Sequence, residues 1–159
     1  MEEPGFGVLG CDLGADGTNA ALIQIPAGGS AKPATVETVQ AREHYLRMNG
    51  KEVFKVAVKA MSQAAMSILE KNGATPDDLV CIIPHQANIR IIEALASRLE
   101  LSMDRFFVNI QKYGNTSAAS IPLALDEARI EHNFKRGDLI LLVAFGAGLT
   151  WAASVIRWY

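Results

Sequence analysis

Apolar positions along this chain follow two different periods, and each period predicts a different kind of element. Continuous apolar runs at residues 79–83 and 138–145 are bounded by turn-forming residues, which is typical of strands buried on both faces. Helical spacing of apolar residues predicts helices over 52–72, 87–99 and 116–132. Further strands are predicted at 7–14, 20–25, 105–110 and 149–158, the last antiparallel to the strand before it.

The remaining stretch, residues 26–49, has no clear period. Its first part is rich in Gly, Pro, Ser and Ala and is predicted to be a loop, and residues 35–49 are predicted to be mostly irregular. Strands that alternate with helices in the rest of the chain predict an α/β fold with a layered sheet.

Composition narrows the class of protein. A chain of 159 residues, half of them apolar and a fifth charged, is sufficient for one core. The net charge of −2 argues against a general nucleic-acid binder. No apolar run approaches the roughly 20 residues needed to span a bilayer, and the N-terminus lacks a basic and apolar leader. We therefore expect no nucleic acid, no membrane and a cytoplasmic location.

Polar residues that could do chemistry stand where predicted strands end. His85 follows one apolar run, Asn115 precedes a predicted helix about thirty residues later, and Gly146-Ala147-Gly148 turns the chain after a further thirty or so. In open α/β sheets, ligands bind beyond the carboxyl ends of the strands. The three features together predict a pocket lined with hydrogen-bond donors, suited to stabilising negative charge on a carbonyl oxygen.

Each of these features also has a purely structural interpretation. His85 alone is more simply a histidine satisfied at a strand end, Asn115 a turn residue or helix cap, and the glycine run a hairpin turn. Only their combination favours a functional pocket.

The cysteines and the other two histidines are not expected to take part in chemistry. Cys81 lies within a predicted buried strand and Cys11 stands beside an acidic residue, so both are expected to be non-catalytic. No cysteine or histidine spacing suits a metal, and no metal site is expected. His44 and His132 are expected on the surface.

The arginines around the helix after His85 form either a solvated face or a site for an acidic partner or a phosphate; they are Arg90, Arg98 and Arg105.

Four strings carry a family resemblance: 45–54 (YLRMNGKEVF), 84–88 (PHQAN), 114–120 (GNTSAAS) and 144–151 (AFGAGLTW). With them, the chain from about residue 4 to its end resembles the C-terminal half of the β-ketoacyl-acyl-carrier-protein synthase III family. The resemblance implies a thiolase-like half with a five-stranded mixed sheet flanked by helices. Residues 1–50 would be the end of the first half and a connecting segment, and residues 51–159 the C-terminal domain.

The resemblance also implies roles for particular residues. His85 and Asn115 would be the catalytic hydrogen-bond donors, and the amide of Ala147 in the turn Gly146-Ala147-Gly148 would be an oxyanion-hole donor. The positions that match the substrate tunnel are Phe54, Asn88 and Phe145. Those that match the docking patch for the acidic carrier protein are Arg90 and Arg98.

The implied activity is a decarboxylative condensation of acyl-CoA with malonyl-acyl-carrier protein that initiates type II fatty-acid synthesis. It needs no cofactor, since the CoA thioester and the phosphopantetheine arm are substrates. The catalytic cysteine belongs to the family's N-terminal half, and nothing here matches it. The isolated chain is therefore expected to be inactive, and the family implies a homodimer. Alternatives are a non-catalytic subunit that binds carrier protein, or a thioester hydrolase or decarboxylase that uses the donor pair alone.

Overall fold

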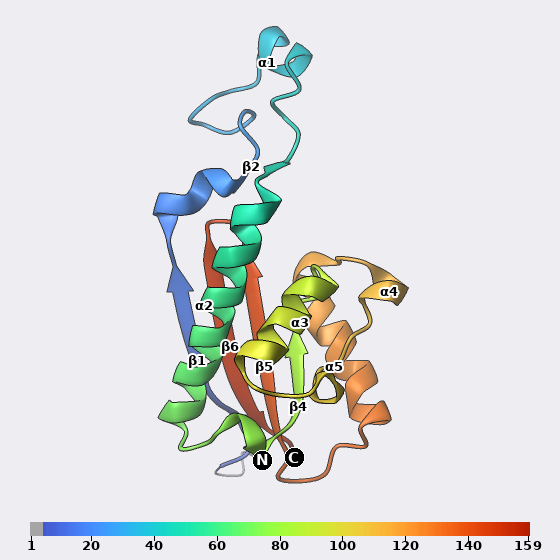
Figure 1. Cartoon of the computed structure of the whole chain (residues 1–159). Helices are drawn as coiled ribbons and strands as arrows, with labels where there is room; N and C mark the ends of the chain where they lie inside the picture. The colour runs from blue at the N-terminus through green and yellow to red at the C-terminus, as the bar shows by residue number, and fades with distance from the viewer. Residues whose placement is uncertain (1–4) are drawn as a thin grey trace.

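A computed structural model describes residues 5–159, which are built around a four-stranded mixed sheet (Figure 1). Its strands, in spatial order, are β1 (Gly7–Ala15), β6 (Thr150–Arg157), β5 (Leu139–Gly146) and β4 (Leu79–Pro84). β4 and β5 are parallel, whereas β5 and β6, and β6 and β1, are antiparallel. The prediction that the last strand runs antiparallel to its predecessor is confirmed.

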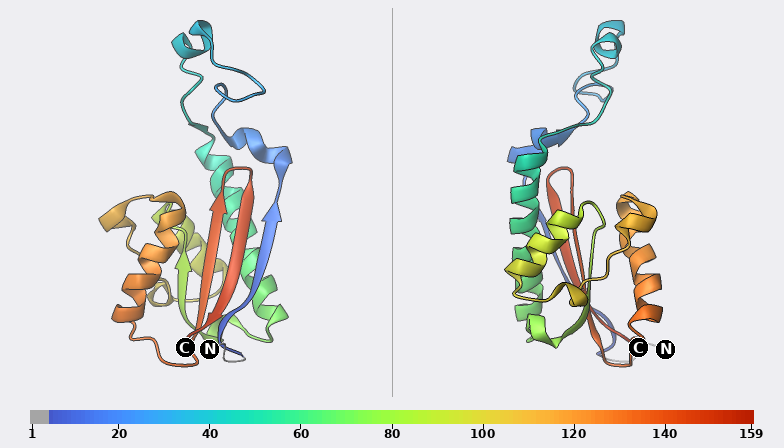
Figure 2. Two further views of the ribbon diagram at one scale, coloured as in Figure 1. Left: turned by 180° about the vertical axis from the view of Figure 1, so that it is seen from behind. Right: turned by 45° about the vertical axis from the view of Figure 1, so that its right-hand side comes forward.

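Helices cover the two faces of this sheet unequally (Figure 2). The helices α2 (Gly50–Lys71) and α3 (Ile89–Arg98) pack on one face and form the larger core with β4, β5 and β6. The helix α5 (Ser120–Glu131) packs on the other face beside β4, around a smaller core. On that second face β1 is left uncovered, since Leu13 is 76% exposed.

α2 forms where the helical period predicted it. The side chain of Asn49 caps its start by accepting a hydrogen bond from the backbone N–H of Glu52, and Asn72 follows its last residue. Small buried residues allow the helix to lie close to the sheet; they are Ala57, Ala60, Ala64 and Ala65. The short turn η2 (Pro76–Asp78) then leads into β4.

The predicted strand at 20–25 is wrong. Residues Gly17–Leu22 form a 3-10 helix, η1, and only Ile23–Gln24 (β2) is extended, paired with Arg47–Met48 (β3). The carboxylate of Asp16 accepts hydrogen bonds from the backbone and side chain of Thr18 and from the side chain of Asn19. These bonds extend the turn into a helix.

The segment expected to be irregular contains one short helix, α1 (Val36–Gln40). Thr35 and Thr38 form a reciprocal capping box at its start. Between β2 and β3 the chain runs out beyond the end of the sheet and back, and α1 lies at the tip of this excursion (Figure 1).

The predicted strand at 105–110 is reduced to a single parallel bridge between Phe106 and Ile82. The sheet therefore has four strands, with this bridge beside β4 where a fifth was expected. A 3-10 turn, η3 (Met103–Arg105), precedes the bridge, and the short helix α4 (Ile110–Tyr113) follows it. The backbone of Phe107 and Asn109 bonds to the side chain of Gln86 instead of continuing a strand ladder.

The mixed sheet flanked by helices is confirmed. β1, from the predicted segment 1–50, pairs with β6, so the sheet draws on both predicted segments. α2 begins at Gly50, beside the predicted boundary, which stays a prediction. Across residues 5–159, no helix is both long enough and apolar enough to cross a membrane.

Candidate active site

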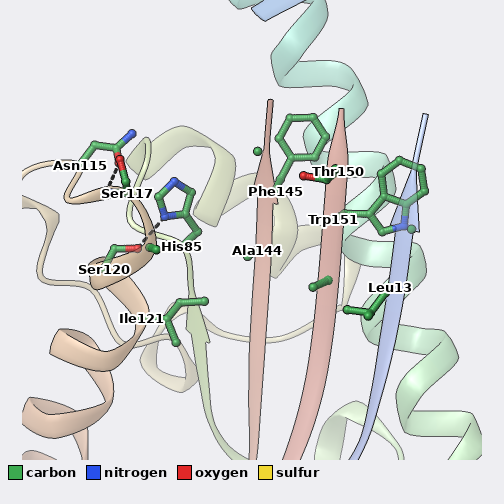
Figure 3. Close-up of a pocket in the computed structure, with 14 residues that line it drawn as sticks. Leu13, His85, Asn115, Ser117, Ser120, Ile121, Ala144, Phe145, Thr150 and Trp151 are labelled. Atoms are coloured by element: carbon green, nitrogen blue, oxygen red, sulfur yellow. Dashed lines mark hydrogen bonds between the residues drawn. The ribbon is translucent and has the colours of Figure 1, made fainter. Parts of the chain in front are cut away.

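A pocket of about 700 Å³ opens where β4 and β5 end and β6 begins (Figure 3). Loops after β4 and α4 contribute polar side chains to one wall, and the sheet contributes apolar ones to the other. The residues that line it include His85, Asn115, Ser117, Ser120, Phe145, Gly146 and Trp151. The structure thus places His85, Asn115 and the start of the glycine turn around one cavity, as the sequence predicted.

His85 directly follows β4 and is half-buried. Its backbone N–H donates to the carbonyl of Val143 at 2.8 Å, which continues the pairing of β4 with β5 and fixes the residue at the pocket wall. Its Nδ1 lies 2.6 Å from Oγ of Ser120, and the other ring nitrogen points away from that serine (Figure 3). Burial lowers the pKa of His85 below its ordinary value of 6.5, which favours a neutral imidazole at pH 7.

Asn115 stands in a turn between α4 and the 3-10 segment η4 (Ser117–Ala119). Gly114 ends α4 with a φ of 68°, a conformation that favours glycine. The Oδ1 of Asn115 accepts a hydrogen bond from the backbone N–H of Ser117 at 3.0 Å. This bond fixes the amide orientation and turns the Nδ2 donor away from the turn (Figure 3).

The glycine turn closes the pocket between β5 and β6. Phe145 and Gly146 line the cavity, whereas Ala147 and Gly148 are exposed in the turn beyond it. The hydroxyl of Thr150 donates to the carbonyl of Ala147 at 3.2 Å and fixes the turn.

Trp151 forms part of the sheet side of the pocket, and it depends on a glycine in the neighbouring strand. A Cβ on Gly14 would lie 2.3 Å from the indole Nε1 of Trp151, so only glycine fits opposite this ring. Neither Trp151 nor Leu13 was singled out from the sequence as a pocket residue.

A buried carboxamide joins the two loops that carry the polar side chains. Gln86 is 1% exposed, and its Nε2 donates to the carbonyls of Pro84 and Phe107 at 2.8 and 3.1 Å. Its Oε1 accepts from the backbone N–H of Asn109 at 3.1 Å. The contacts of Gln86 and Ser120 were not predicted from the sequence, although both residues lie within the strings that carry the family resemblance.

Several residues predicted to contact substrate or partner lie outside the pocket lining. Phe54 is half-buried on α2. Asn88 is exposed and caps α3, accepting from the backbone N–H of Arg90 at 2.9 Å. Arg90 and Arg98 are exposed at the two ends of α3. Their roles remain predictions.

Arg105 does not join the exposed arginines of α3. It is half-buried, and its guanidinium donates to the carbonyl of Leu79. It therefore ties the η3 turn to the start of β4.

Neither cysteine lines the pocket. Cys81 is fully buried in β4, and burial raises the pKa of its thiol to about 12. Cys11 is exposed on β1, with its Sγ 3.4 Å from Oγ of Ser154. Among residues 5–159, no group of three or more His, Cys, Asp or Glu side chains is arranged to hold a metal ion.

The two remaining histidines differ from each other. His44 is exposed beside Tyr45, as predicted. The prediction for His132 is wrong, since its ring is half-buried between Phe107 and Phe134, with ring centroids 5.9 and 6.1 Å apart. The aromatic neighbours of His132 are distant in sequence or follow a turn, so local polarity did not reveal them.

Comparison with known families decides what this arrangement is related to. The family model described as 3-oxoacyl-[acyl-carrier-protein (ACP)] synthase III C terminal matches residues 69–158, more than half of the chain. The chain belongs to this family. A β-ketoacyl-[acyl-carrier-protein] synthase III of Caldanaerobacter subterraneus subsp. tengcongensis is 56% identical over 98% of this chain and 47% of its own length. One from Roseiflexus sp. is 50% identical over 99% of this chain.

Solved synthase III structures have the same fold. The enzyme from Aquifex aeolicus matches 99% of this chain and 46% of its own with a TM-score of 0.85 and 44% identity. That from Thermus thermophilus matches 100% of this chain and 48% of its own with a TM-score of 0.86 and 45% identity. The thiolase-like fold class and the resemblance to a C-terminal half are confirmed. The chain spans about half the length of the relatives it matches.

Proposed function

We propose that this chain is the C-terminal part of a 3-oxoacyl-[acyl-carrier-protein] synthase III and supplies the donor pair for its condensation step. His85 Nε2–H and Asn115 Nδ2–H would donate to the thioester carbonyl oxygen of malonyl-acyl-carrier protein. This step would begin type II fatty-acid synthesis from an acyl-CoA primer. The CoA and phosphopantetheine thioesters would be substrates, and no cofactor is needed.

The proposed chemistry needs donors where charge develops. The bond between the malonyl α-carbon and its carboxylate breaks, carbon dioxide leaves, and the electron pair moves onto the thioester as an enolate. The enolate carbon then attacks an acyl group held as a thioester on a cysteine, whose thiolate leaves. Neutral donors fixed beside the enolate oxygen stabilise that transition state better than mobile water does.

The observation that supports this proposal is the orientation of the two side chains. Ser120 occupies Nδ1 of His85, and the N–H of Ser117 occupies Oδ1 of Asn115. Both residues line one pocket, with their other nitrogens turned away from these partners. Because Nδ1 of His85 and Oδ1 of Asn115 are already bonded within the protein, Nε2 and Nδ2 are the atoms left to donate to a substrate.

Binding of the substrates would extend beyond this pair. The amide of Ala147 would stabilise an oxyanion on the acyl group, while Phe145 at the pocket wall would contact the acyl or pantetheine chain. Phe54 and Asn88 would act farther along the tunnel. Arg90 and Arg98, exposed on α3, would attract the acidic carrier protein, which is an interaction that weakens with salt.

The chain would need a nucleophile from elsewhere. Cys81 is buried with a raised pKa and Cys11 lies outside the pocket, which supports an N-terminal half as the source of the catalytic cysteine. We infer that the chain alone transfers no acyl group. Exposed apolar side chains such as Val8, 64% exposed, and Leu13 favour burial against another surface, and we infer a homodimer of the whole protein.

The decisive experiment joins this chain to its N-terminal half and follows condensation of acetyl-CoA with malonyl-acyl-carrier protein. His85→Ala and Asn115→Ala should each lower kcat/KM by about 100- to 1,000-fold, the cost of losing one such donor. His44→Ala and Gln63→Ala, at exposed positions away from His85 and Asn115, serve as matched controls. Full activity in either donor variant would refute the proposal.

Three further outcomes separate the alternatives. Intact-mass analysis with acetyl-CoA should show an acyl adduct only when the N-terminal half is present. An adduct on Cys11 or Cys81 would refute the inference that the nucleophile comes from the N-terminal half. Binding of carrier protein without condensation in the joined protein would indicate a non-catalytic subunit. Malonyl-thioester decarboxylation or hydrolysis by the chain alone would indicate that the donor pair acts without the other half.

A further inference from the structure

Ser120 is a buried serine at the first position of α5, and its hydroxyl faces His85. It is 2% exposed, and its Oγ lies 2.6 Å from Nδ1 of His85 and 3.4 Å from the backbone nitrogen of Gln86. The directions of these two hydrogen bonds decide which ring nitrogen of His85 carries the proton.

The direction of these bonds follows from what each partner has to offer. The amide of Gln86 can only donate, so it uses a lone pair of Oγ. Within residues 5–159, the hydrogen bonds of Oγ run to Gln86 and His85 alone. The serine proton therefore has one acceptor, Nδ1 of His85, and the opposite arrangement would leave a buried hydroxyl proton without a partner.

We propose that Ser120 is a positioning residue: it donates its hydroxyl proton to Nδ1 and thereby holds His85 as the Nε2–H tautomer. The hydrogen bonds then run in one direction, from the amide of Gln86 to Ser120 and from Ser120 to His85. The assignment of the tautomer follows from this geometry alone, whereas its catalytic consequence rests on the proposed function. That consequence is a donor at Nε2, which the enolate oxygen requires.

Both ends of this arrangement are held in place. The backbone of His85 is bonded to Val143 in β5, and the side chain of Gln86 bonds to three backbone groups, so the backbone that carries both partners of Ser120 is held in place. Ser120 itself is fixed at the start of a twelve-residue helix. A fixed triplet of this kind sets the tautomer before substrate binds.

The direct test measures the ¹⁵N shifts of the histidine rings in the 159-residue chain, well above the pH at which His85 protonates. His44→Gln and His132→Gln variants assign the three rings. His85 should show a protonated, pyrrole-like Nε2 and an unprotonated, pyridine-like Nδ1. A protonated Nδ1 in the unmodified chain would overturn the proposal without any variant being needed.

Variants then isolate the hydroxyl. Ser120→Ala should lower the ratio of the Nε2–H to the Nδ1–H tautomer by about tenfold, as expected when one buried donor is lost. Ser120→Thr, which keeps the hydroxyl, should restore the ratio. Ser97→Ala, at an exposed position on α3, should leave it unchanged. An unaltered ratio in folded Ser120→Ala would overturn the proposal.

Activity of the joined protein distinguishes this inference from the proposed function. Ser120→Ala should lower kcat for condensation with little change in the KM for malonyl-acyl-carrier protein, by the factor by which the measured Nε2–H fraction falls. If the Nε2–H fraction falls in Ser120→Ala and kcat does not fall with it, the positioning of His85 stands and its role as the donor fails. If the tautomer does not shift, the positioning role fails whatever the activity.

Discussion

The side-chain oxygen of Gln86 accepts a hydrogen bond from the backbone N–H of Asn109 at 3.1 Å, which connects the loop of His85 to the segment that leads to Asn115. The same carboxamide donates to the carbonyls of Pro84 and Phe107. Because all these groups are buried or partly buried, the spacing of the two pocket loops depends on one residue that does not itself line the pocket.

Replacing Gln86 by Leu should therefore be costly. The substitution keeps the approximate volume but leaves the amide of Asn109 and two carbonyls without their partner, at about 1–3 kcal/mol for such a buried group. Urea unfolding monitored by circular dichroism measures the loss. Gln63→Leu, at an exposed position on α2, is the matched control. Equal midpoints for the two variants would contradict a clamp at Gln86.

How much the sequence reveals depends on whether the decisive interaction is local. The apolar runs at 79–83 and 138–145 and the helical period of α2 are local patterns, and each was predicted within a residue or two. The turn to η1 was missed although its signal was local, since the side-chain bonds of Asp16 outweighed the β-branched and apolar residues that follow.

The pocket was predictable in position but not in detail. His85 and the glycine turn follow strands whose ends coincide, so the rule for α/β sheets placed them correctly. The failed strand at 105–110 and the contact of Ser120 with His85 depend on partners 21 to 35 residues away. Pairings at such separations follow from the packing of α5 and β4, which one sequence without its fold does not fix.

Gly14 is expected to tolerate no side chain. In Gly14→Ala the new Cβ would stand 2.3 Å from the Trp151 ring, so the indole must move or β1 must shift. Such overpacking costs about 1–3 kcal/mol. Thermal unfolding measures the cost, and fluorescence in a Trp158→Phe background reports the displacement of Trp151. Gly17→Ala is the control, because a Cβ there meets nothing within 4 Å. A native spectrum and midpoint in Gly14→Ala would show that the strand yields freely.

Glu127 on α5 should hold α4, and with it the turn of Asn115. Its carboxylate accepts from Lys112, from the hydroxyl of Tyr113 at 2.5 Å and from the side chain of Asn109 at 3.0 Å. Hydrogen bonds from Lys112, Tyr113 and Asn109 lower the pKa of Glu127 to about 2, from 4.5. A depressed carboxyl pKa contributes stability that is present above pH 4.5 and is lost as the pH falls toward 2.

Hydrogen exchange tests this clamp more directly than global stability does. In Glu127→Gln at neutral pH, the amides of residues 110–115 should exchange faster, because the charge-assisted bonds from Lys112 and Tyr113 are weakened. In the unmodified chain, the protection factors of the same residues, taken relative to the intrinsic exchange rate at each pH, should fall on acidification below pH 4.5. Asp126→Asn removes a neighbouring, more exposed carboxylate that pairs with Arg129 and should leave these residues unchanged. Uniform protection in both variants would mean that α4 is held by other contacts.

The half-buried imidazole of His85 should make the free energy of unfolding depend on pH just below 6.5, a higher range than that of Glu127. Its pKa in the folded chain is below 6.5 because burial disfavours the cation, so the unfolded chain binds more protons as the pH falls through this range. The contribution of neutral His85 is fully present above pH 6.5 and is lost progressively as the pH falls toward the folded pKa. Chemical unfolding at a series of pH values should therefore show a decline in the free energy of unfolding just below 6.5.

Substitution of His85 separates this contribution from that of the carboxylates. His85→Asn should flatten the decline below pH 6.5, even if the variant is less stable at every pH because Ser120 loses its partner. His44→Asn, at an exposed position, should leave the decline intact. If the decline persists unchanged in His85→Asn, the imidazole titrates alike in both states. The pocket would then not disfavour the cation.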